Sequence, residues 1–232
     1  MRNWISLVLV AAVFFPLPAR PIEITQVAGK FSCPELDNQQ ECAIKFEKLF
    51  LDAHPGFVSQ DEKFLRIRSK AGRYVLLRNG DPEVFPDSSC PRNVLELQGN
   101  GKFLVMREQF FEGNTWQLLD LRNGKLTETF GYSLFSPSGA RFVAASEDLD
   151  AGYSDTVLDI YQVSASGIKR TFRAIQPKEP GWAARDIRWD GEDTIRFLQV
   201  KYSPASPTGF EEIPAYLLYR NGSWELHQGG AR

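Results

Sequence analysis

The sequence predicts an all-β fold: a small β-propeller-like array of about four four-stranded units, with one short N-terminal helix. Three observations predict it. From Phe57 onward, apolar and polar residues alternate with a period of two, which is the pattern of half-buried strands. The tripeptide Arg-Asn-Gly recurs at 78–80, 122–124 and 220–222, each time after an apolar strand. A repeat of roughly 40–50 residues with four strands is typical of propeller blades.

Each unit is expected to contain four strands in chain order. The units span 57–85, 94–130, 132–172 and 186–226. Asn-Gly supplies two residues that tolerate positive φ, so we expect tight type I′ hairpins between the third and fourth strands of three units. Four blades are the minimum for a closed ring, and the alternative is an open array or a twisted sandwich. A short strand at 22–27 could close the ring from outside.

The first nineteen residues have the order of a secretory signal peptide. Arg2 precedes an apolar run from Trp4 to Leu17, and Pro18 and Ala19 follow it. The run is short for a membrane span, so we expect cleavage after Ala19, with an uncleaved N-terminal anchor as the alternative. Three segments result: the signal peptide 1–19, an N-terminal strand and helix at 20–56, and the propeller-like domain 57–232. We expect no stable membrane anchor after cleavage and a periplasmic or secreted protein.

Residues 20–56 contain the predicted helix and two of the three cysteines. Ala43, Phe46 and Phe50 recur at helical spacing, which predicts a helix at about 39–51. Cys33 and Cys42 lie close in sequence and would pair in an oxidising compartment, leaving Cys90 over. Other pairings of the three remain open.

Composition and motifs exclude several function classes. The 27 basic and 29 acidic residues nearly balance, so no general attraction to nucleic acid is expected. The two histidines and three cysteines show no metal-ligand spacing, and no cofactor is predicted. The sequence has no nucleophile elbow and no phosphate-binding loop, so no catalytic residue is assigned.

The loops between second and third strands are the expected functional face, because rigid sheets would hold them on one side. In unit two this segment is Glu108-Gln-Phe-Phe-Glu-Gly-Asn-Thr-Trp116, and in unit three it is Glu147-Asp-Leu-Asp-Ala-Gly-Tyr-Ser-Asp155. Trp182 lies on the connection between units three and four, and we expect it near the same side. The candidate ligand-binding residues are Phe111, Glu112, Trp116, Asp148, Asp150, Tyr153 and Trp182. The alternatives are packing between units for the aromatics, and turn capping or calcium binding for the carboxylates.

One turn carries a family resemblance. Phe135-Ser-Pro-Ser-Gly-Ala-Arg-Phe142 resembles the Phe-Ser-Pro-Asp-Gly-Lys-Arg-Phe turn of TolB-type and WD40-like β-propeller repeats, with Ser138 in place of the usual Asp. Residues 90–200 are also similar to exported bacterial proteins of unknown function, which share the shapes Phe-Phe-Glu-Gly…Trp-Gln-Leu-Leu-Asp and Ser-Glu-Asp-Leu-Asp-Ala-Gly-Tyr. The resemblance implies export and a propeller-like fold, and it implies no activity.

These observations favour a binding or scaffold protein of the bacterial envelope, more a binder than an enzyme. Its acidic and aromatic loop face would recognise a protein or a glycan, with aromatics supplying contact area and carboxylates supplying orientation. The alternative is a carboxylate-dependent, glycosidase-like hydrolase on the same face. It would pair Glu112 or Glu108 with Asp148 or Asp150.

Overall fold

The computed structural model describes residues 26–27, 30–31, 39–60, 64–68, 72, 74–78, 92–110, 113–146, 149, 156–175 and 181–229. Within these residues the chain forms seventeen strands and one helix. The predicted all-β fold with a short N-terminal helix is confirmed. Cys33 and Cys90 lie outside the described residues, so the Cys33–Cys42 pairing stays a prediction.

The helix α1 extends over Gln39–Ala53, two residues further than predicted. It ends at His54-Pro55-Gly56, where the His54 amide donates to the Phe50 carbonyl at 3.0 Å and Gly56 adopts a φ of +76°. Glycine reaches this left-handed conformation without a steric penalty, so it stops the helix cleanly.

The strands form consecutive antiparallel sheets that match the predicted units. Unit one is β3 (Val58–Gln60), β4 (Phe64–Arg68) and β5 (Tyr74–Arg78). Unit two is β6 (Arg92–Gln98), β7 (Phe103–Phe110), β8 (Gly113–Asp120) and β9 (Lys125–Thr129). Unit three is β10 (Leu134–Phe135), β11 (Arg141–Ala145), β12 (Val157–Ser164) and β13 (Gly167–Ile175). Unit four is β14 (Trp182–Trp189), β15 (Thr194–Tyr202), β16 (Phe210–Arg220) and β17 (Ser223–Gln228). The fourth strand predicted for unit one, 82–85, falls outside the described residues.

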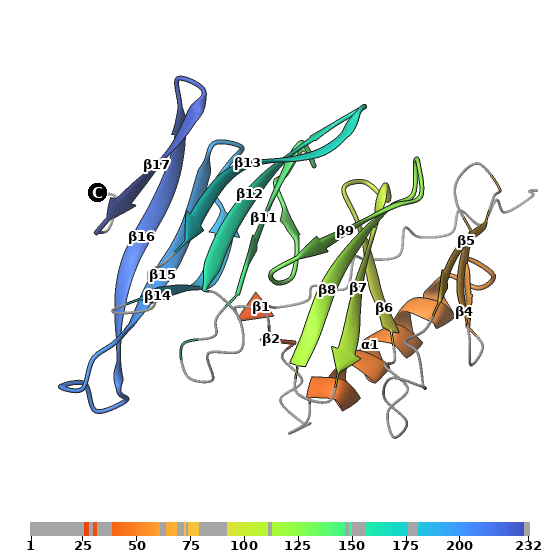
Figure 1. Ribbon diagram of the computed structural model, residues 1–232, viewed down its shortest axis with the longest axis horizontal. Helices are drawn as coiled ribbons and strands as arrows, with labels where there is room; N and C mark the ends of the chain where they lie inside the picture. The colour runs from red at the N-terminus through yellow and green to blue at the C-terminus, as the bar shows by residue number, and fades with distance from the viewer. Residues whose placement is uncertain are drawn as a thin grey trace, which may run out of the picture.

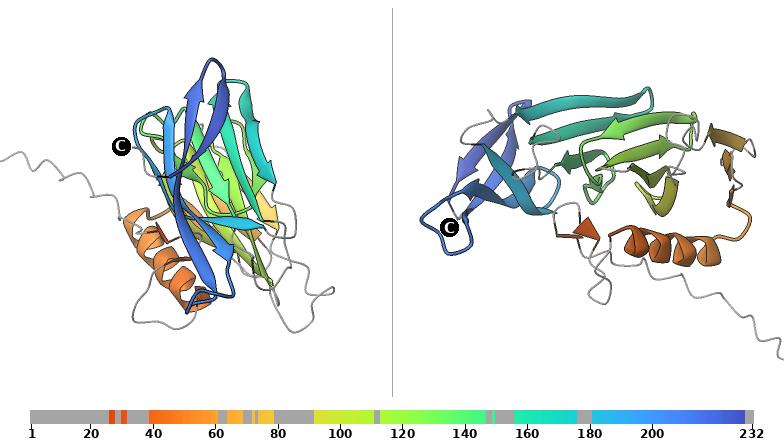
Figure 2. Two further views of the ribbon diagram at one scale, coloured as in Figure 1. Left: turned by 90° about the vertical axis from the view of Figure 1, so that its left-hand side faces the viewer. Right: turned by 60° about the horizontal axis from the view of Figure 1, so that its bottom comes forward.

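The units stand in a row in chain order, and units one and four lie at opposite ends of the molecule (Figures 1 and 2). The array is therefore open, which was the alternative to a closed ring. Of the predicted strand at 22–27, the described part is β1 (Gln26–Val27), which pairs with β2 (Lys30–Phe31). The N-terminal segment covers the first strands of the units, because β1 contacts β14 and α1 contacts β6.

The hydrophobic core consists of three clusters, and each lies between neighbouring units. The cluster between units one and two includes Leu65, Leu104 and Phe50 of α1. The cluster between units two and three includes Phe103 and Phe142, and the one between units three and four includes Ile160 and Leu217. Inter-unit packing of this kind is how blades of a propeller stabilise one another.

Two of the Asn-Gly corners fall within the described residues, and they differ. Asn221 and Gly222 have φ values of 52° and 84° and form a two-residue hairpin between the paired Arg220 and Ser223. Positive φ at both central residues is the type I′ geometry that the sequence predicts.

The corner at Asn123-Gly124 is not a type I′ hairpin, so that expectation is wrong there. Asp120 pairs with Lys125, and four residues lie between them; Gly124 alone has positive φ, at 76°. The Asp120 carboxylate explains the wider turn. Its oxygens accept hydrogen bonds from the Arg122 amide at 3.0 Å, the Arg122 side chain at 2.7 and 2.8 Å, and the Asn123 amide group at 3.1 Å.

The turn after β10 joins unit three to unit four. Gly139 has a φ of 71°, and its amide donates to the Ser136 carbonyl at 2.8 Å. Ser138 donates to the Glu192 carboxylate from its amide at 2.6 Å and from its hydroxyl at 2.7 Å. Arg141 donates to the Asp193 carboxylate at 2.8 Å and stacks over the ring of Tyr219. Ser138, in the usual place of Asp, thus connects neighbouring units.

Candidate functional site

The strand ends that flank the connections between second and third strands lie at one edge of the array, the lower edge in Figure 1. The ends of β7, β11 and β15 lie there, together with the starts of β8, β12 and β16. The turns between third and fourth strands lie at the opposite edge. The antiparallel order of every sheet produces this arrangement, because alternate connections must emerge at opposite ends. We call the lower edge the loop edge.

Five of the seven predicted site residues lie outside the described residues: Phe111, Glu112, Asp148, Asp150 and Tyr153. Only their order in the chain is known: residues 111–112 join β7 to β8, and the other three fall between β11 and β12. Their role in binding stays a prediction.

The other two predicted residues lie in the core. Trp116 is 6% exposed and meets Tyr132 edge-on at 5.4 Å between ring centroids. Trp182 is 8% exposed and stacks on Phe197 at 5.7 Å. These contacts match the packing alternative for both rings, so contact area for a partner must come from other side chains.

Glu108, near the end of β7 in unit two, is a buried carboxylate with a structural partner. It is 8% exposed and accepts a hydrogen bond of 2.7 Å from Nε2 of Gln117. A glycosidase-like acid pair needs carboxylates that face a shared opening. The position of Glu108 between strands does not provide one, and its suggested partners lie outside the described residues.

The acidic segment between β11 and β12 is anchored at its base. Ser146 and Val157 form a backbone hydrogen bond of 3.0 Å, in which the Ser146 amide donates to the Val157 carbonyl. The Val157 amide in turn donates to the Ser146 hydroxyl at 3.3 Å. The ends of the segment are therefore fixed to the loop edge by the ladder of unit three.

Sequence analysis missed the aromatic pair at the connection between β15 and β16 of unit four. Tyr202 ends β15, Phe210 begins β16, and the two are direct cross-strand partners with ring centroids 6.2 Å apart. Tyr202 is 65% exposed, the largest exposed fraction among the large hydrophobic side chains of the described residues. The signal that could have found them is the pair of aromatics flanking the Pro- and Ser-rich segment 203–209.

Segment 203–209 forms an ordered turn. The Ser203 amide donates to the Gly209 carbonyl at 2.8 Å, and the Gly209 amide donates to the Ser206 carbonyl at 3.0 Å. The hydroxyls of Ser206 and Thr208 lie 3.0 Å apart. This network holds Tyr202 and Phe210 at a fixed place on the loop edge.

A polar cluster lies at the end of β6, the strand that α1 contacts, and includes Tyr132, which precedes β10. Nε2 of Gln98 donates to the Glu96 carboxylate and to the Tyr132 hydroxyl. Burial raises the pKa of Glu96 to about 7, although the hydrogen bond from Gln98 opposes the shift. Glu96 therefore gains and loses its proton near neutral pH.

Two further findings concern the described part of the chain. No group of three or more His, Cys, Asp or Glu side chains within it could hold a metal ion. The helix found there is too short and too polar to cross a bilayer.

Comparisons with known proteins give distant structural likenesses. No family model and no curated protein matches the sequence. Among solved structures, the tricorn protease matches with a TM-score of 0.40 and 15% identity, over 72% of this chain and 17% of that one. TolB from Acinetobacter baumannii matches with a TM-score of 0.33 and 16% identity, over 81% of this chain and 46% of that one. The chain thus spans less than half the length of either protein. The propeller-like fold rests on the strand order within each sheet.

Proposed function

We propose that this chain is an exported protein of the bacterial envelope that binds a protein or a glycan through its loop edge. It acts as a binding or scaffold protein in the periplasm or after secretion. The proposal combines the signal-peptide pattern of residues 1–19 with the position, at one edge, of the strand ends that flank the connections between second and third strands in units two, three and four.

The exposure of Tyr202 is the observation that carries the proposal. Large aromatic rings exposed on a rigid hairpin supply contact area at low entropic cost, and they are enriched at recognition surfaces. In sequence, the neighbouring tips carry Phe111, Glu112, Asp148 and Asp150. Carboxylates beside an aromatic anchor would orient a partner and repel unsuitable ones.

Binding is favoured over carboxylate-based hydrolysis because of Glu108. A general acid or nucleophile must reach its substrate, whereas Glu108 is buried and hydrogen-bonded to Gln117. The hydrolase alternative would then depend on Glu112 together with Asp148 or Asp150.

The test is affinity capture by the chain lacking residues 1–19. Cross-linked envelope extract and purified peptidoglycan are offered separately, and captured material is identified by mass spectrometry. We expect one reproducible partner, with capture lowered about tenfold by Tyr202→Ala or by Asp148→Asn with Asp150→Asn.

Matched controls separate the loop edge from general surface effects. Tyr74 of unit one is 60% exposed at the far end of the array, so Tyr74→Ala removes an equally accessible ring elsewhere. Glu128→Gln with Glu225→Gln removes two exposed carboxylates from β9 and β17. Equal loss of capture in test and control variants, or no loss in either, would refute the loop edge as the binding site.

A further inference from the structure

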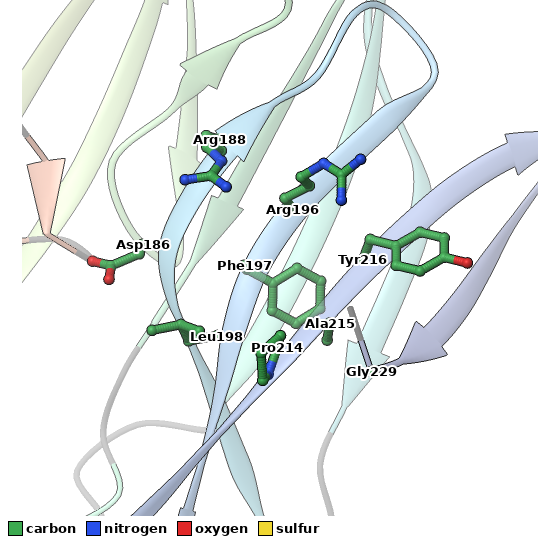
Figure 3. A pocket seen from close by; sticks show the side chains of 9 residues that line it. All are labelled: Asp186, Arg188, Arg196, Phe197, Leu198, Pro214, Ala215, Tyr216 and Gly229. Atoms are coloured by element: carbon green, nitrogen blue, oxygen red, sulfur yellow. The ribbon is translucent and has the colours of Figure 1, made fainter. Parts of the chain in front are cut away.

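A pocket of about 330 Å³ opens on the fourth sheet, away from the loop tips (Figure 3). The inner face of this sheet packs Ile195 and Leu217 into the core between units three and four. Side chains alternate along a strand, so Arg196 and Tyr216 project from the opposite, outer face. Unit four is the last of the described four-stranded sheets in the row, and the small sheet of β1 and β2 contacts its first strand, β14.

One row of side chains crosses the whole outer face. Arg188 on β14 is the direct partner of Arg196 on β15, which is the direct partner of Tyr216 on β16. Tyr216 is in turn the partner of His227 on β17, and the two rings stack at 4.7 Å. The row therefore places two guanidinium groups side by side and an aromatic ring next to them.

The two arginines are incompletely neutralised. Arg196 donates to the Asp190 carboxylate at 2.7 Å, and Arg188 forms no hydrogen bond or ion pair within the described part of the chain. Like charges placed opposite each other on adjacent strands are destabilising. An anion bound between the two guanidinium groups would remove that repulsion.

A β-bulge creates the arrangement. Arg185 pairs with Leu198, but Arg188 pairs with Arg196, so β14 advances three residues while β15 advances two. Without the irregularity, Ile187 would lie opposite Arg196. Asp186 within the bulge has a φ of 54°, a left-handed conformation that is uncommon for residues other than glycine. Bulges and strained residues of this kind concentrate at functional sites, where they redirect a side chain.

We propose that this pocket binds a carboxylate group that carries an aromatic or apolar substituent. Guanidinium groups match the two oxygens of a carboxylate, and the ring of Tyr216 lines the pocket beside Arg196. Leu198 and Pro214 supply apolar lining for the substituent. Asp190 pairs with Arg196, and the carboxylate of Asp186 also lines the pocket, so a monoanion fits better than a doubly charged phosphate. The site is independent of the loop edge.

Nuclear magnetic resonance titration with N-acetyl-phenylalanine tests the site, using its amide and phenyl phosphate as comparisons. We expect a Kd of about 1 mM at low salt for the carboxylate, and no saturable binding of the amide. N-acetyl-aspartyl-phenylalanine amide carries its carboxylate on a side chain. Whichever of the two carboxylates binds more tightly assigns the source as a chain terminus or an acidic residue.

Variants locate the binding. Arg188→Gln should weaken binding about tenfold, and Arg188→Lys should weaken it less because the charge remains. Arg220→Gln, at the exposed end of β16, is the matched control and should bind normally. Arg188 is exposed, so unchanged melting curves should accompany these losses. Equal binding of the amide, tighter binding of phenyl phosphate, or normal binding by Arg188→Gln would each overturn the proposal.

Discussion

Replacing Glu96 with Gln should raise stability at alkaline pH and leave it unchanged at acid pH. Glu96 lies on β6, the strand that α1 contacts, and its carboxylate accepts a hydrogen bond from Gln98. Burial raises its pKa from 4.5 to about 7. Gln keeps the shape and an acceptor oxygen but cannot ionise, so the substitution isolates the charge.

The direction in which stability changes with pH follows from the protons that the folded and unfolded states bind. Between pH about 4.5 and about 7 the folded state holds a proton on Glu96 that the unfolded state has released. Stability therefore falls as pH rises through this window, and the loss is complete above it. Each pKa unit corresponds to about 1.4 kcal/mol, so the wild type loses about 3 kcal/mol of unfolding free energy that Glu96→Gln retains.

Thermal and urea unfolding at pH about 5 and about 8 measure the effect. For a chain of this size we expect Glu96→Gln to melt about 6–12 °C above the wild type at the higher pH and within about 2 °C of it at the lower. Glu128→Gln, which changes an exposed carboxylate on β9, should match the wild type at both. If wild type and Glu96→Gln show the same pH dependence, Glu96 is charged in the folded protein and the reasoning fails.

Two further predictions concern close packing and the wide turn. A Cβ on Gly131 would lie 1.8 Å from the Ala145 carbonyl oxygen, so Gly131→Ala should cost about 3 kcal/mol in urea unfolding. Gly191→Ala, where φ is +75° and space is open, should cost only about 1 kcal/mol, and equal costs would contradict the clash. Burial would raise the pKa of Asp120, but hydrogen bonds and charge from Arg122 hold it below its ordinary value of 3.8. Asp120→Asn should therefore destabilise the protein by about 1 kcal/mol near pH 7, with the difference vanishing as pH falls below about 4.

Most of the fold could be predicted because strand alternation is a local property. Residues on one face of a strand recur at every second position. A strand that packs one face against the core can therefore be recognised from its own sequence. The same rule would have placed Trp116 in the core, since Trp116 and Leu118 share a face of β8 and both are buried. The position of Trp116 at the end of segment 108–116, beside the predicted loop, pointed instead to the binding face.

The features that escaped prediction depend on contacts distant in sequence or on a break in the period. The turn at Asn123 widens because Asp120 captures the donors that follow it, which a dipeptide preference cannot reveal. Arg188 meets Arg196 only because a bulge shifts β14, and a bulge leaves no mark in the alternation. Tyr202 was overlooked because the Pro- and Ser-rich segment conceals how far β15 extends.

The outer faces of the two end units explain why the array is open. On unit one, Tyr74 and Leu76 project from β5 with 60% and 58% exposure, while Val75 packs toward the core. On unit four, the corresponding face carries Arg188 and Arg196. Closing the ring would bury these guanidinium groups against apolar side chains, and Arg188 has no described acidic partner to offset the loss of hydration. A closed ring would therefore cost several kcal/mol, whereas the open array leaves the arginines in water and accessible to an anion.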